Sequence, residues 1–119
     1  MIALATLLFW LTALVPIQGQ TIRAVAVGDA IMRHWPEEAQ QTAMCIGYRE
    51  SSFKPWETGA LGERGVFQIL LDSSTVPLIR DLGYRLDQMW EVGPNVHVAS
   101  EMYRQRGLRP WAAQRGVCW

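Results

Sequence analysis

Glu50 is the residue of this chain that is best placed to do chemistry. The apolar residues before it recur at helical spacing, so we expect Glu50 in the last turn of a helix over residues 36–51, near the negative end of the helix dipole. Phe53, Trp56 and Phe67 could supply an apolar wall beside it. The dipole and the loss of solvent both favour the protonated carboxyl, which is the form that a general acid needs near neutral pH.

A second interpretation of Glu50 is open on the residues alone. A solvated glutamate at a helix end can pair with Arg49 or Lys54, which lie close by in the sequence. Composition by itself favours this solvated carboxylate over a catalytic one.

The two cysteines, Cys45 and Cys118, bear on the compartment of the protein. An even count in a chain with an export-like start predicts a disulfide, and two buried free thiols are the alternative. Neither cysteine has a second Cys or a His at ligand spacing, so the pattern does not favour a metal site. His34 and His97 also lack a ligand motif, and we expect surface or helix-packing roles for both.

The first residues are predicted to direct export. Residues 2–17 are apolar apart from two threonines, a run that is short for a spanning helix and typical of the apolar part of a signal peptide. We predict a signal peptide or an uncleaved N-terminal anchor over 1–19, and one folded domain over 20–119. The domain is then secreted or periplasmic, or tethered to a membrane by residues 2–17.

The rest of the chain is predicted to be mostly helical. Residues 21–33 form one or two short helices, with Gly28 and Asp29 as an interruption. A short helix follows to residue 82, and Pro94 opens a last helix that ends at Gly107. Residues 57–65, with three glycines, are expected to form an irregular loop or a short hairpin, and residues 66–71 a strand or a buried helical turn.

Composition limits the partners. The chain has 119 residues, with 11 basic and 11 acidic side chains, so it lacks the basic excess that a nucleic-acid-binding domain needs. Six tryptophans are many for this length, and their flat rings can pack in a core or stack on sugars. We expect a monomer.

Two stretches of the sequence resemble one enzyme family. Tyr48-Arg49-Glu50-Ser51-Ser52-Phe53-Lys54-Pro55 precedes Gly59-Ala60-Leu61-Gly62-Glu63-Arg64-Gly65-Val66-Phe67-Gln68-Ile69. Together they are similar to the signature of the soluble lytic transglycosylase family, in the lysozyme-like superfamily, and the 18 residues from Glu50 to Gln68 match its spacing. Pro94-Asn95-Val96, Ala99, Tyr103, Gly107 and Pro110-Trp111 resemble its last helix and ending.

The resemblance implies an α+β lysozyme-like fold, with the glycine-rich loop beside an active-site cleft. It also implies that Glu50 protonates the oxygen between N-acetylmuramic acid and N-acetylglucosamine of peptidoglycan and then acts as base, without metal or cofactor. The residues that it assigns to the cleft are Gln68, Phe67, Gly62 and Gly65, and turn geometry alone is the alternative role of the two glycines. We also expect Thr58, Glu63 and Tyr103 to contact substrate. Asn95 is expected to be structural, and Ser51 and Ser52 to hold the turn after Glu50.

The sequence departs from the family at two places. Gly59 stands where many members have Ser or Thr, and the segment 111–114 replaces a Tyr-Asn-x-Gly box. A second carboxylate would favour a hydrolase; Glu57, Glu63 and Asp72 are the candidates. Glu63 is the most interesting of them, although it could be a solvated loop charge beside Arg64. We expect a lytic transglycosylase, with a muramidase or a non-catalytic glycan-binding module as alternatives.

Overall fold

The computed structural model describes residues 15–119, and residues 1–14, with most of the predicted signal segment, lie outside that part. The α-helices of the described part are α2 (Val15–His34), α3 (Gln40–Ser51), α4 (Thr75–Asp81) and α5 (Val92–Arg106). The 3-10 helices there are η1 (Glu37–Ala39), η2 (Leu86–Trp90) and η3 (Arg109–Gln114). The prediction of a mostly helical domain with one disulfide is confirmed, and there is almost no strand.

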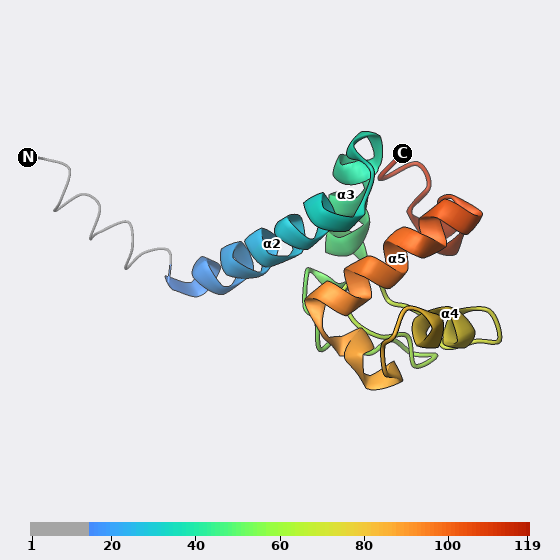
Figure 1. Ribbon diagram of the computed structural model, residues 1–119. Helices are drawn as coiled ribbons and strands as arrows, with labels where there is room; N and C mark the ends of the chain where they lie inside the picture. The colour runs from blue at the N-terminus through green and yellow to red at the C-terminus, as the bar shows by residue number, and fades with distance from the viewer. Residues whose placement is uncertain (1–14) are drawn as a thin grey trace, which may run out of the picture.

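Helix α2 is continuous, which corrects the predicted interruption at Gly28 and Asp29. A side chain at Gly28 would meet the Met44 sulfur at 3.8 Å, so the glycine lies over α3, and helix-to-helix packing outweighs its low helix propensity. The helix also runs through the predicted boundary at residue 19 without a break. Its first half projects from the body of the molecule, and its second half packs mainly against α5 (Figure 1).

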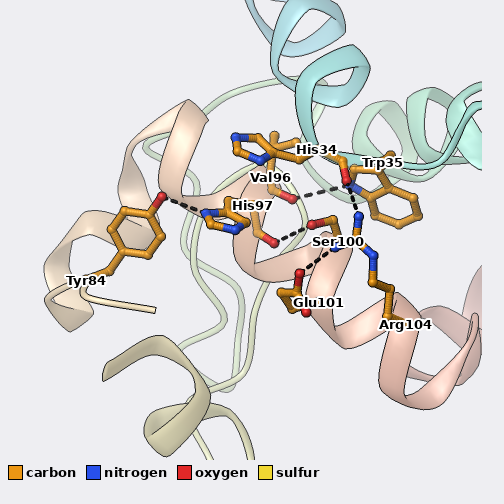
Figure 2. Close-up of polar contacts among 8 residues, drawn as sticks. All are labelled: His34, Trp35, Tyr84, Val96, His97, Ser100, Glu101 and Arg104. Atoms are coloured by element: carbon orange, nitrogen blue, oxygen red, sulfur yellow. Dashed lines mark hydrogen bonds and ion pairs between the residues drawn. The ribbon is translucent and has the colours of Figure 1, made fainter. Parts of the chain in front are cut away.

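An aromatic cluster in the core joins the end of α2 to the last two helical elements. Trp35 stacks on Phe67 and on Tyr103, with ring centroids 5.3 and 5.1 Å away, and lies 5.8 Å from Trp111. The Trp35 indole N–H donates to the Val96 carbonyl at 3.2 Å (Figure 2). Buried aromatic pairs with their N–H groups satisfied stabilise a small core strongly.

The two histidines lie against each other. The rings of His34, at the end of α2, and His97, on α5, stack with centroids 4.3 Å apart, and the Tyr84 hydroxyl lies 2.8 Å from Nδ1 of His97 (Figure 2). Arg104 donates to the His34 carbonyl at 2.8 Å beside this stack. The predicted helix-packing role is therefore confirmed for this pair.

The remaining element predictions are close to the structure. The helix predicted over 36–51 consists of η1 and α3, α4 ends at Asp81, and α5 begins at Val92 rather than at Pro94. Residues 66–71 are neither a strand nor a helical turn: Ile69 forms an isolated bridge with Arg64, which also bridges to Thr58. Within residues 15–119, no helix has the length and apolar character needed to cross a membrane.

Candidate active site

Glu50 lies in the last turn of α3, as predicted, and its side chain is half-buried. The end of the helix packs closely against Val66, which follows the glycine-rich loop, since a side chain at Gly47, one turn before Glu50, would meet Val66 at 3.2 Å. Burial raises the pKa of the Glu50 carboxyl above its ordinary value of 4.5, and the nearby negative charge of Glu63 raises it further. A hydrogen bond from Gln114 opposes these two effects. Burial is the largest of these effects, and the net shift of the Glu50 pKa is upward.

Gln114, at the end of η3, is a site residue that sequence reasoning missed. Its amide nitrogen donates to Oε1 of Glu50 at 3.4 Å, across 64 positions of the chain. A signal was present in the sequence, because Gln114 lies in segment 111–114, one of the two places where the sequence departs from the family that it resembles. A neutral amide here can orient the Glu50 carboxyl without fixing it as a carboxylate.

The disulfide holds Gln114 near Glu50. Cys45 on α3 is bonded to Cys118, with the two Cα atoms 5.5 Å apart, as predicted. The Gln114 carbonyl accepts the backbone N–H groups of Val117 at 3.0 Å and Cys118 at 2.9 Å. The bond therefore ties the last turn of the chain to the helix that carries Glu50.

Glu63 and Gln68 converge on the space next to Gly59. A Cβ at Gly59 would lie 2.6 Å from Oε1 of Gln68 and 2.8 Å from the Glu63 carboxyl carbon. The Gly59 N–H donates to the Glu63 carbonyl at 2.8 Å, which closes the turn. The space that a side chain at position 59 would need is thus occupied by an amide and a carboxylate from two other residues.

The amide of Gln68 is oriented by the backbone of the glycine-rich loop. Its nitrogen donates to the carbonyls of Gly65 at 3.0 Å and Glu57 at 3.3 Å. Both amide protons are committed in this way, so the amide oxygen is directed toward the Gly59 side. Leu61 N–H likewise donates to a Glu63 carboxylate oxygen at 2.6 Å, which orients that side chain.

In the described part of the chain, the non-glycine residues with left-handed backbone lie in this region. Among the described residues, the non-glycine residues with positive φ are Ser52 at 54°, Phe53 at 61° and Gln68 at 48°. Two of them directly follow the end of α3, and the third carries the oriented amide. Such conformations cost on the order of 1–3 kcal/mol each and cluster at functional sites, which supports a functional role for this part of the fold.

The predicted place of Phe67 in the wall of a cleft is wrong. Its side chain is fully buried between Trp35 and Trp111, so it belongs to the core and cannot form a cleft wall. Its N–H donates to the buried Asn95 side chain at 2.9 Å, and Asn95 in turn donates to the Arg64 and Met89 carbonyls. The structural role expected of Asn95 is confirmed.

Gly65 is required by this same packing. Its φ is +74°, and a Cβ would lie 2.1 Å from the Met89 carbonyl oxygen and 2.6 Å from the Asn95 amide nitrogen. The missing side chain therefore lets the Met89 carbonyl and the Asn95 amide approach the backbone, and we assign Gly65 no substrate contact. Gly62, with φ +84° and open space around it, meets the backbone demand of the turn.

Thr58 and Tyr103 lie outside the group formed by Glu50, Glu63, Gln68 and Gln114. The Thr58 hydroxyl accepts the Trp90 indole N–H at 3.1 Å on the surface. The Tyr103 ring is engaged with Trp35. Neither contact reaches Glu50. That Thr58 and Tyr103 contact substrate stays a prediction.

Ser51 anchors the turn after Glu50, as expected. Its buried hydroxyl lies 3.0 Å from the Gly47 carbonyl and 2.9 Å from the Val66 carbonyl. Because one hydroxyl proton serves both carbonyls, Ser51 links the end of α3 to the loop that carries Gln68. Trp56, predicted as an apolar wall, is 59% exposed and lies under the guanidinium of Arg23.

Comparisons with family models, with curated proteins and with solved structures found no match. Within residues 15–119, no three or more His, Cys, Asp or Glu side chains gather in a way that could hold a metal ion. Glu50 and its carboxylate and amide neighbours are groups of the kind that acid–base chemistry uses.

Proposed function

We propose that this protein cleaves the β-1,4 bond between N-acetylmuramic acid and N-acetylglucosamine in peptidoglycan, as a lytic transglycosylase with an α+β lysozyme-like fold. The single observation that carries the proposal is the half-buried Glu50 carboxyl, with its raised pKa, at the position of the family's catalytic acid. The motif around it supports the substrate class, and the strained turn after it supports a functional role.

Glu50 acts first as acid and then as base. Its proton passes to the glycosidic oxygen, so the bond to the muramic acid C1 breaks and the leaving sugar departs as an alcohol. The carboxylate then removes the proton of the sugar's own C6 hydroxyl, whose oxygen closes on C1 and gives a 1,6-anhydro end. Gln114 keeps the carboxyl oriented through both steps.

Hydrolysis is the second candidate outcome, and Glu63 is the observation that favours it. Its charge acts on Glu50, and its carboxyl occupies the space beside Gly59 next to the Gln68 amide. A second carboxylate can activate water, whose hydroxyl would then add to C1 in place of the C6 oxygen. The product would carry a reducing end.

Replacement of Glu50 by Gln tests the proposal. We expect Glu50→Gln to lower release of soluble fragments from peptidoglycan by about a hundredfold or more, because the general acid is lost. Glu38→Gln is the matched control, since it makes the same change at an exposed position in η1, outside the candidate site, and should retain activity.

Mass spectrometry of the wild-type fragments separates the two outcomes, because an anhydro end is one water lighter than a reducing end. Unchanged release by Glu50→Gln would refute the catalytic role. A wild-type protein that binds glycan without cutting it would indicate the non-catalytic module.

An exported location is part of the proposal. The disulfide supports it, because such bonds persist in secreted and periplasmic proteins and are rare in the reducing cytosol. The apolar residues 2–17 would serve as a signal or as a tether to the membrane. A monomer is sufficient, because all four site residues come from one chain.

A further inference from the structure

A pocket of about 220 Å³ adjoins Gln68 on the side of α4 and α5. Buried side chains of Thr75, Met102 and Trp111 form part of its wall, and Leu70 and Pro110 contribute further apolar atoms. Arg106, in the last turn of α5, also lines it. The pocket therefore combines apolar walls with one cation, next to a residue of the candidate active site.

The guanidinium of Arg106 is uncommitted. Across residues 15–119 it makes no ion pair and no hydrogen bond, although the guanidinium groups of Arg64, Arg85 and Arg104 all donate to oxygens. A guanidinium presents a planar fork of donors that matches a carboxylate in a bidentate geometry. Arg106 is thus a donor with the geometry of a carboxylate site and no internal acceptor.

Asp72 sets the charge that the pocket can accept. It lies at the exposed rim, where hydrogen bonds from Thr75 and Ser74 lower the pKa of its carboxyl to about 2 and keep it ionised. One carboxylate oxygen accepts from both of those residues and is not directed to Arg106. With one cation and one anion around it, the pocket suits a single negative charge better than a doubly charged phosphate.

We infer that this pocket binds a carboxylate carried by the glycan substrate, with Arg106 as the hydrogen-bond donor to it. Gln68 lines both this pocket and the candidate active site, so it joins the two. The inference rests on the proposed function. Muramic acid offers carboxylates from two sources: the lactyl group when it is free, and the stem peptide when one is attached. Both present the same planar anion to Arg106.

Binding to three polymers tests the inference. All proteins carry Glu50→Gln, which prevents cleavage, and each is then compared with and without Arg106→Ala. The polymers are peptidoglycan with its peptides, glycan strands stripped of peptides by an amidase, and chitin, which has the same linkage and no carboxylate. Arg109→Ala is the control, because it removes the same charge from an exposed neighbour that does not line the pocket.

We expect Arg106→Ala to weaken binding to a carboxylate-bearing polymer by about tenfold, to leave chitin binding within about twofold, and to be partly rescued by Arg106→Lys. Loss on intact peptidoglycan alone indicates the stem peptide, and loss on the stripped strands indicates the lactyl group. No loss on either, or an equal loss on chitin, overturns the inference.

The wild-type cleavage assay distinguishes failure of the carboxylate inference from failure of the proposed function. If wild-type protein releases fragments but Arg106→Ala has no selective effect, only the carboxylate inference fails. If it releases none while the selective loss stands, only the catalytic proposal fails. If none of the polymers binds, both fail.

Discussion

Removal of the Cys45–Cys118 bond should destabilise this protein more than any single change on its surface. The bond spans a sequence separation of 73 residues. Chain entropy for a loop of that length gives about 4 kcal/mol of stabilisation through the unfolded state. A small domain has a total stability of about 5–15 kcal/mol, so the bond supplies a large share of it.

The assay is urea and thermal unfolding of Cys45→Ala/Cys118→Ala beside the wild type. We expect the midpoint temperature to fall by at least about 15 °C, since 1 kcal/mol shifts it by about 4–8 °C in a domain of this size. The urea dependence should steepen, because an unfolded chain without the cross-link exposes more surface. Wild-type protein reduced by a thiol reagent is the control, because it loses the same bond without a change of residue.

Activity adds a second readout. The bond holds Gln114 beside Glu50, so the variant should lose activity even at temperatures where it is still folded. A loss of stability below about 1 kcal/mol, in both the variant and the reduced protein, would refute the entropic reasoning. Full activity in the folded variant would show that Gln114 needs no tether.

Three further predictions concern the site and the core. Glu63→Gln removes a charge that raises the pKa of Glu50, so the alkaline limit of activity should move to lower pH. Gln114→Leu removes a hydrogen bond that lowers this pKa, so the same limit should move to higher pH. Shifts in the same direction in the two pH–rate profiles would contradict the assignment of Glu50 as the general acid. Gly59→Ser places a Cβ against the flexible ends of the Gln68 and Glu63 side chains, so the free energy of unfolding should fall by less than about 1 kcal/mol. Release of soluble fragments should nevertheless fall strongly, because both side chains must move. A rise in activity would mean that the site lacks a hydroxyl. Burial and the charges of His97, Arg33 and Arg104 lower the pKa of His34 below 6.5, against the opposing charge of Glu101. The folded state therefore binds fewer protons than the unfolded chain, and the free energy of unfolding should fall as the pH drops from about 7 to about 5. Urea unfolding at several pH values should give a smaller dependence of this free energy on pH for His34→Phe, and an unchanged dependence would exclude His34 as the cause.

Local patterns were sufficient for α3, α4 and α5 and for the position of Glu50 in the last turn of its helix. Apolar spacing with Pro, Gly and acidic residues at the ends places α3, α4 and α5 within a few residues of their actual bounds, because these signals act within one or two turns. The disulfide also followed from the sequence, because only one pairing of two cysteines exists. Gly28 shows the limit, since its place over Met44 is set by packing against another helix.

The composition of the site was decided by contacts between distant parts of the chain. Gln114 reaches Glu50 across 64 positions, and the His34–His97 stack joins α2 to α5. Phe67 carries an apolar side chain that suits either a cleft wall or a core, and only the positions of Trp35 and Trp111 assign it to the core. Periodicity shows which face of an element is apolar, but it does not show what that face meets, because the partner is set by the packing of the whole chain.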